Sequence, residues 1–372
     1  MDGTQLDKLI KRMTLEEKAS LCSGADKWST ERIDRLGIPS IFMADGPHGL
    51  RREEEVTGLL QAQSLPATCF PTASALGATW NRELLSEIGA ALGRECQAAG
   101  VQILLGPGIN MKRTPLCGRN FEYFSEDPYH TALMAVSFIK GVQGQGVGTS
   151  LKHFAVNNQE YLRFTIDMMV DQKTLRDFYL RAFEIVVKEA EPWTVMSSYN
   201  RLNGEYVSES ARLLTRILRQ EWGFDGFVVS DWASIYDRVK ALDAGCDLDM
   251  PGSMGQTDAE IVAAVKKKKL DKKRLDASVK AILGMVFRAH EARKETKTDM
   301  GAHHLLARKA AGESAVLLKN DGGLLPIAAG KEKGGGVVNR IAVIGEFAVK
   351  PRYQGGGSSH VNAAREEIPY DQ

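Results

Sequence analysis

The sequence predicts an α/β fold in which parallel strands, each followed by a helix, form a barrel. Short apolar runs that end on polar residues alternate with helical segments, and at least six such passages lie between about Ile41 and Pro251. That number favours a (β/α) barrel over an open sheet, and no fixed short period indicates a solenoid. In such barrels the functional side chains gather where the strands end.

Composition and charge exclude several classes of partner. The chain has 372 residues, 43% hydrophobic and 26% charged, and its 48 Lys and Arg balance 47 Asp and Glu. This balance gives no electrostatic reason to expect a nucleic acid or a membrane surface as partner. The N-terminal stretch is charged and lacks a secretory signal, which favours a cytoplasmic protein, and no apolar run approaches membrane-spanning length. The five cysteines lack metal-ligand spacing, so we expect free thiols rather than a disulfide framework or a zinc site.

The first part of the chain predicts helices over residues 4–22 and 82–99 and a short strand over 41–44. The strand stops at Asp45 in a turn sequence, so Asp45 is either a site residue at a strand end or an ordinary turn aspartate. Residues 53–67, entered by three consecutive glutamates, predict a surface loop with solvated charge.

Polar loops after the next strands carry candidate ligand residues. The segment CGRNFEYFSEDP places Arg119 near Glu122, so Arg119 could bind a ligand or be only an ion-pair partner of Glu122 or Glu126. A later strand is expected to end just before Lys152 and His153, and Arg163 lies in the polar loop beyond them. A lone histidine there would be structural, but an adjacent Lys–His pair with a second cation indicates a polar ligand site.

Two further strands are predicted at 194–196 and 227–229. The second is followed at once by Ser230 and Asp231, and a buried parallel strand that ends on a carboxylate places it at the functional rim of a barrel. Asp231 is therefore the candidate nucleophile. Asp247 and Asp249 follow a very short strand, and we expect turn and capping roles for them.

The chain is predicted to divide into a barrel over residues 1–290, a polar linker over 291–301 and the start of a second α/β domain over 302–372. The last part contains a helix and two apolar strand-like runs, SAVLLKN and NRIAVIG. Two such strands cannot complete a doubly covered sheet, and unpaired edges favour association. We therefore expect self-association or pairing with a complementary C-terminal chain.

Five motifs together resemble glycoside hydrolase family 3, and specifically its β-glucosidases: MADGPHGLR, CGRNFEYFSEDP, SLKHFAVNNQE, MSSYNRLNGEYVSES and GFDGFVVSDW. Their order and spacing hold from Thr14 to about Val361. The resemblance implies a (β/α)8 TIM-like barrel followed by an α/β sandwich domain, here incomplete, and retaining hydrolysis of β-glycosides through a glycosyl-enzyme intermediate on Asp231. The residues that it assigns to the sugar ring are Asp45, Arg119, Lys152, His153, Arg163 and Tyr199, with Met196 and Trp232 lining the same subsite. The implied chemistry requires no metal and no organic cofactor.

One residue implied by the resemblance is missing. Retaining hydrolysis needs a second carboxyl about 5 Å from the nucleophile, acting first as acid and then as base. In the glucosidase branch this Glu lies beyond the point where the sequence ends, and no glutamate here matches it. The sequence therefore predicts a fragment or split protein with weak or no activity alone. Nearby Lys152, Arg163 or His153 would keep Asp231 ionised, and Tyr199 would orient it.

Three alternatives stay open. The chain could be a non-catalytic sugar-binding fragment or split-enzyme subunit, or a β-xylosidase or other exo-glycosidase of the same family. Asp45 suits the hydroxyls at C4 and C6 of glucose, but the pattern does not separate glucose from xylose or supply an aglycone preference. The third alternative, an aldolase with a Schiff base on Lys152, is less favoured because nothing marks that lysine as desolvated.

Overall fold

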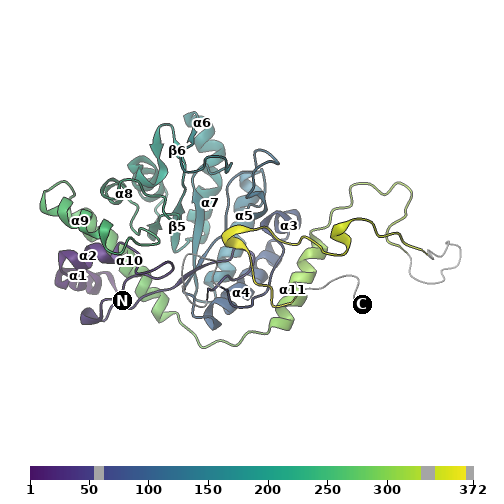
Figure 1. Cartoon of the computed structure of the whole chain (residues 1–372), viewed down its shortest axis with the longest axis horizontal. Coiled ribbons are helices and arrows are strands. Elements are labelled where there is room, and N and C mark those ends of the chain that lie inside the picture. The colour runs from purple at the N-terminus through teal and green to yellow at the C-terminus, as the bar shows by residue number, and fades with distance from the viewer. Residues whose placement is uncertain (54–62, 328–339, 366–372) are drawn as a thin grey trace.

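The computed structural model describes residues 1–53, 63–327 and 340–365. At its centre lies a sheet of five parallel strands in the order β1-β2-β3-β5-β8 (Figure 1). The strands are β1 (Met43–Asp45), β2 (Ile103–Leu105), β3 (Gly148–Phe154), β5 (Thr194–Ser197) and β8 (Phe227–Val229). Because all five run in the same direction, their carboxyl ends share one edge.

Isolated bridges extend this sheet into a closed ring. In order they are Val229–Leu248 and Ser23–Asp249, both parallel, then Gly24–Thr30 and Ser29–Phe42, both antiparallel. Phe42 directly precedes β1, so the bridges return to the first strand. The ring closes through segments at 248–249, 23–24 and 29–30, the last of which runs antiparallel to its neighbours. The predicted (β/α)8 TIM-like barrel is confirmed, with this local departure.

Helices cover the ring, including those in the predicted ranges 4–22 and 82–99, whereas the helices over 73–78 and 256–266 were not predicted. Those that flank the strands are α1 (Gly3–Arg12), α2 (Leu15–Leu21), α3 (Ala73–Ala78), α4 (Arg82–Ala98), α5 (Pro128–Gln143), α7 (Arg181–Ala190), α8 (Arg238–Ala244), α9 (Gln256–Lys266), α10 (Lys272–Glu291) and α11 (Met300–Glu313). The expected single helix over 4–22 is two helices, because Met13 is extended and Thr14 caps the second through a capping box with Glu17.

The remaining elements are short. They are the strands β4 (Asp167–Met168), β6 (Arg201–Leu202) and β7 (Glu205–Tyr206), the helical turns η1 (Asp34–Leu36), η2 (Asn120–Glu122), η4 (Val207–Glu209), η6 (Glu346–Ala348) and η7 (Gly357–Ser359), and the helix α6 (Gln172–Thr174). Two further segments are π-helical, namely η3 (Leu175–Tyr179) and η5 (Arg212–Glu221).

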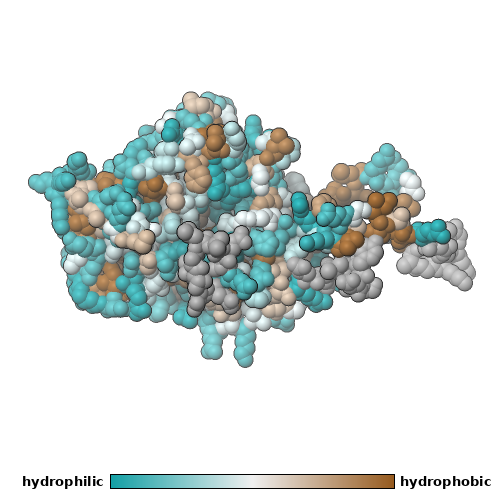
Figure 2. All heavy atoms as spheres, in the orientation of Figure 1, coloured by the Kyte–Doolittle hydropathy of each residue, from teal (hydrophilic) through white to brown (hydrophobic). Residues whose placement is uncertain are grey.

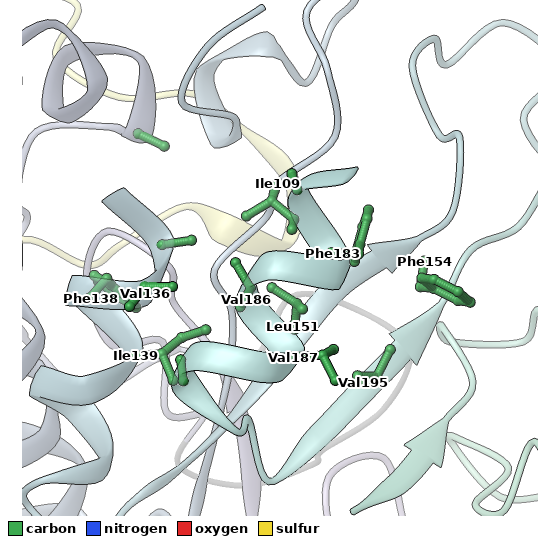
Figure 3. Packing of buried hydrophobic residues seen from close by; sticks show 14 of the residues in the cluster. Ile109, Val136, Phe138, Ile139, Leu151, Phe154, Phe183, Val186, Val187 and Val195 are labelled. Atoms are coloured by element: carbon green, nitrogen blue, oxygen red, sulfur yellow. The ribbon is translucent and has the colours of Figure 1, made fainter. Parts of the chain in front are cut away.

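Strand side chains alternate between two apolar clusters, as the two faces of a strand require. One face packs on the helices that surround the sheet, through residues such as Ala44, Leu104, Val195 and Val228. The opposite face belongs to the second cluster, through Met43, Ile103, Leu105, Met196, Phe227 and Val229. Figure 3 shows the outer packing, where Leu151 and Val195 lie beside Val186 and Val187 of α7.

Two glycines allow α4 and α5 to touch through their backbones. A Cβ on Gly89 would lie 2.3 Å from the carbonyl oxygen of Phe138, and one on Gly141 would lie 2.3 Å from that of Ser86. Both distances are far below van der Waals contact, so any larger residue would separate the helices. This contact fixes the helical layer behind β2 and β3.

Asp247 has a different role from the turn or capping role predicted for it. Its side chain is 1% exposed and binds Arg219 at 2.5 Å and Arg274 at 3.0 Å. The Ser278 hydroxyl and the Val228 backbone N–H also donate to it, at 2.6 Å and 2.8 Å. The carboxylate therefore joins β8, η5 and α10. Sequence reasoning missed this because its partners come from separate elements.

The part of the chain after α11 departs most from the prediction. Residues 315–327 and 340–345, which include most of the two expected strands, form no strand in the structure. Leu318 and Ile344 are 91% and 88% exposed. Strands of this kind need neighbours to pair with, and within the described residues none is offered. Residues 328–339 and 366–372 of the predicted second domain lie outside the described residues.

The exposed segment extends from α11 as an arm (Figure 1), and apolar residues gather on it (Figure 2). The chain then returns to the barrel, where Ala363 pairs in parallel with Ala67 and Val361 is fully buried. The helices of the described part of the chain are all too short or too polar to span a lipid bilayer.

Candidate active site

A cavity of about 270 Å³ opens at the carboxyl ends of the parallel strands. All nine site residues predicted from the sequence line it: Asp45, Arg119, Lys152, His153, Arg163, Met196, Tyr199, Asp231 and Trp232. They come from β1, β3, β5, the residue that directly precedes η2 and the segments that follow the strands, which the closed ring brings together. One boundary differs from the prediction, because β3 continues to Phe154 and so contains Lys152 and His153.

Asp231 lies two residues beyond β8 and has an incompletely satisfied carboxylate. The backbone N–H of Trp232 donates to Oδ1 at 2.8 Å, whereas Oδ2 is buried without a hydrogen-bond partner in the described part of the chain. Burial raises the pKa of Asp231, and the charges of Arg119 and Lys152 oppose that rise without cancelling it. Lys152 therefore favours the ionised form of Asp231, as the sequence predicted, but burial has the larger effect on the pKa.

Lys152 and Asp45 form an ion pair in the cavity wall. The Nζ–Oδ1 distance is 2.9 Å, and the two side chains are 3% and 9% exposed. A buried charge pair of this kind presents a cation and a carboxylate side by side, which suits a ligand that both donates and accepts hydrogen bonds. The pairing also argues against Lys152 as a free amine for Schiff-base chemistry.

His153 is neutral and its tautomer follows from its partners. A guanidinium nitrogen of Arg119 lies 2.8 Å from Nε2, and because a guanidinium can only donate, Nε2 accepts. The ring proton is then on Nδ1, which lies 3.3 Å from the Tyr123 hydroxyl. Burial and the charges of Arg119 and Lys152 lower the pKa of His153 well below 6.5. The 3.7 Å approach of Nε2 to Asp231 is therefore not an ion pair.

Arg163 stands at the edge of the cavity between acidic and aromatic partners. It binds Glu160 at 3.0 Å and lies over the rings of Tyr199 and Phe164, at 4.5 Å and 5.1 Å from their centroids. Tyr199 is buried beside Asp231, and desolvation and that carboxylate raise the pKa of its hydroxyl. At ordinary pH Tyr199 is therefore a donor towards the carboxylate or a ligand.

Five lining residues were not predicted as site residues: Lys27, Trp28, Arg51, Glu53 and Ser358. Glu53 belongs to the run expected to be solvated, yet it is 3% exposed. It accepts from Lys27 at 2.9 Å and from the indole of Trp28 at 2.8 Å. No local signal separated Glu53 from the glutamates that follow it, which lie with residues 54–62 outside the described residues.

The described lining contains three carboxylates, Asp45, Glu53 and Asp231, among several cations and aromatic rings. Such a mixture recognises a polyhydroxylated ring through paired hydrogen bonds and stacking. Within the described residues no group of three or more His, Cys, Asp or Glu side chains is arranged to hold a metal ion. The five cysteines are free thiols in the described structure, and burial raises the pKa of Cys22 to about 12.

The chain is similar to known proteins over most of its length. The family model "Glycosyl hydrolase family 3 N terminal domain" matches residues 10–285. The chain is 57% identical over its full length to the thermostable beta-glucosidase B of Acetivibrio thermocellus and covers 48% of that protein. It is 47% identical to an exo-alpha-(1->6)-L-arabinopyranosidase of Bifidobacterium longum, over 96% of this chain and 47% of that protein.

Solved structures are similar in fold as well as sequence. The beta-glucosidase of Bifidobacterium adolescentis matches with a TM-score of 0.88 and 45% identity, over 97% of this chain and 51% of that one. Beta-glucosidase 3B of Thermotoga neapolitana, solved with α-D-glucose, matches with a TM-score of 0.89 and 39% identity, over 97% of this chain and 52% of that one. The chain thus spans about half the length of these relatives.

Proposed function

This chain belongs to glycosyl hydrolase family 3, and we propose that it binds the terminal sugar of a β-glucoside and forms a glycosyl-enzyme intermediate on Asp231. The observation that carries this proposal is the position of Asp231 Oδ2, which lies without a hydrogen-bond partner among the described residues and belongs to the cavity lining. An unpartnered carboxylate oxygen is available to attack, and the surrounding groups suit sugar hydroxyls.

In the proposed first step, Asp231 Oδ2 forms a bond to the anomeric carbon, and the bond from that carbon to the leaving oxygen breaks with its electron pair. Water then attacks the same carbon, loses a proton to solvent and releases the Asp231 carboxylate with net retention. Arg119, Lys152 and Asp45 hold the ring hydroxyls and keep the anomeric carbon near Oδ2. Trp232 contributes an aromatic face, with its indole N–H fixed on the Lys27 carbonyl at 2.8 Å.

Among the described lining residues, neither Glu53 nor Asp45 is suited to protonate the leaving group. A general acid needs a raised pKa, but Lys27 and the Trp28 indole outweigh burial and lower the pKa of Glu53. Asp45 is engaged by Lys152. We therefore propose slow turnover of substrates with poor leaving groups, because loss of general acid catalysis costs about 10² to 10⁴ in rate.

An activated 2-deoxy-2-fluoro aryl β-glucoside tests the proposal, since its leaving group needs no acid. We expect a covalent adduct on Asp231 by mass spectrometry and none in Asp231→Asn. Folded protein that forms no adduct but binds glucose would support the alternative, a non-catalytic sugar-binding fragment. Folded protein that does neither would overturn the proposal.

The arabinopyranosidase relatives favour a second candidate, hydrolysis of a pentopyranoside. A panel of nitrophenyl glycosides that includes β-glucoside, β-xyloside and α-L-arabinopyranoside separates the two. Preference for either pentose would replace glucose as the proposed sugar.

We further propose association through the apolar arm formed by residues 315–327 and 340–349. Val316, Leu318 and Ile344 are 64%, 91% and 88% exposed on it, and such exposure favours pairing with a second copy or a complementary chain. Light scattering tests this, and a monodisperse monomer at high concentration would contradict self-association.

A further inference from the structure

We propose that Glu122 is a positioning residue, which links the docked segment 354–363 to Arg119 and so adjusts the cavity for sugar binding. This inference rests on the proposed function. Glu122 does not line the cavity and was considered from the sequence only as an ion-pair partner of Arg119. Its two carboxylate oxygens, however, bind different parts of the chain.

One oxygen of Glu122 holds the guanidinium of Arg119. Oε2 accepts from Nε at 2.8 Å and from a terminal nitrogen at 2.6 Å, and the Glu122 side chain is 2% exposed. The same terminal nitrogen of Arg119 donates to His153 at 2.8 Å. Glu122 therefore sets the direction in which Arg119 enters the cavity.

The other oxygen of Glu122 binds the returning chain. Oε1 accepts from the hydroxyl of Ser359, which is 237 residues away in sequence and 1% exposed. The charges of Arg119 and Lys152 and this hydroxyl outweigh burial and lower the pKa of Glu122, so the carboxylate is ionised with both oxygens occupied. A buried acid satisfied from two sides couples its partners, because loss of either leaves charge uncompensated.

Contacts in addition to that with Glu122 hold the segment 354–363 on the barrel. Arg51 donates to the Gly357 carbonyl at 3.0 Å, and Val361 is fully buried. A Cβ on Gly355 would lie 2.5 Å from the ring of Phe121, the residue before Glu122. The docked segment also brings Ser358 into the cavity lining. A continuous set of contacts therefore runs from the docked segment through Glu122 to the cavity.

The test compares Glu122→Gln, Ser359→Ala and the double variant with the exposed Glu126→Gln from the same loop as control. The probe is a 2-deoxy-2-fluoro β-glucoside with a dinitrophenyl leaving group, and adduct formation on Asp231 gives KI and the limiting rate. We expect KI to rise about 10- to 100-fold in Glu122→Gln and about 3- to 10-fold in Ser359→Ala, with a smaller change in the limiting rate. The double variant should be no worse than Glu122→Gln, because both act through one contact.

A merely structural role would lower the melting temperature and leave KI unchanged, and that result would overturn the inference. Additive effects in the double variant would also overturn it. Trypsin cleavage after Arg352 supplies a readout that does not depend on sugar chemistry. It should accelerate in Glu122→Gln and Ser359→Ala but not in Glu126→Gln, and equal rates in all would refute the link. If the wild type neither forms an adduct nor binds glucose, the proposed function is wrong. The trypsin cleavage rates still test the link between Glu122 and the segment 354–363 in that case.

Discussion

Asp231 and Asp247 are buried aspartates on neighbouring segments of the barrel ring, yet their carboxylates have very different partners. Asp247 accepts from two arginines, one serine and one backbone N–H, which satisfy both oxygens. Asp231 accepts one backbone N–H on Oδ1, and its Oδ2 has no partner among the residues that the structure describes.

The contrast shows what distinguishes a structural acid from a reactive one in the same fold. The hydrogen bonds and ion pairs of a fully paired carboxylate offset the free energy cost of its desolvation and hold the surrounding elements together. An underpaired one keeps a raised pKa and an open oxygen, which costs stability and leaves it available for chemistry. Replacing each in turn should separate function from stability.

The largest expected effect is on chemistry at Asp231. Asp231→Asn removes the attacking oxygen, so adduct formation with the fluoro-glucoside should fall by at least ~10⁴-fold. Stability at neutral pH should change by no more than about 1 kcal/mol and rise rather than fall, because a buried, underpaired charge is removed. Mass spectrometry and urea denaturation measure the two effects, and a large loss of stability would contradict the comparison.

Asp247→Asn should do the reverse. Breaking a buried carboxylate away from Arg219 and Arg274 costs about 3 to 5 kcal/mol in the free energy of unfolding. At a temperature where the variant stays folded, the labelling rate of Asp231 should stay within a few-fold of the wild type. Urea denaturation checks the first expectation, and a loss of less than 1 kcal/mol would show that the four contacts are not cooperative.

The pH dependence of labelling sharpens the comparison further. The folded pKa of Asp231 is raised above its ordinary value of 3.8, so the ionised fraction falls as the pH drops through that higher pKa. The rate should decline about tenfold per pH unit below it, starting above pH 3.8, while circular dichroism shows intact protein. A rate that stays constant down to pH 3.8 in folded protein would contradict the raised pKa.

The smallest expected effect concerns the neutral histidine beside Asp231. Because the folded pKa of His153 is lowered below 6.5, its contribution to stability is complete above pH 6.5 and is lost as the pH falls towards the folded pKa. The slope is about 1.4 kcal/mol per pH unit in that window. His153→Asn should show a shallower slope, whereas His48, whose pKa burial lowers to about 4, titrates in both proteins. Equal slopes would indicate that His153 is charged.

Much of the fold and the residue set of the candidate site could be predicted from the sequence. The strand at 227–229 has its predicted bounds, and the helix predicted over 82–99 is α4, whose N-terminus Asn81 caps. These features are local, since they depend on short apolar runs and capping side chains. Six of the nine candidate residues follow the same logic, because parallel strands bring their carboxyl ends to one rim however far apart they are in sequence. Met196, Tyr199 and Trp232 were implied by the resemblance to family 3.

Only the tertiary structure decided which side chains are buried, which are paired and which apolar runs form strands. Glu53 and Ser358 line the cavity because segments distant in sequence meet at it. Asp247 accepts hydrogen bonds from several elements for the same reason. The apolar runs at 314–320 and 340–345 show the converse, since β-rich sequence forms no strand where the described chain offers no neighbour. Sequence identifies which groups can act, whereas their ionisation and pairing depend on solvent and partners that the fold alone brings together or excludes.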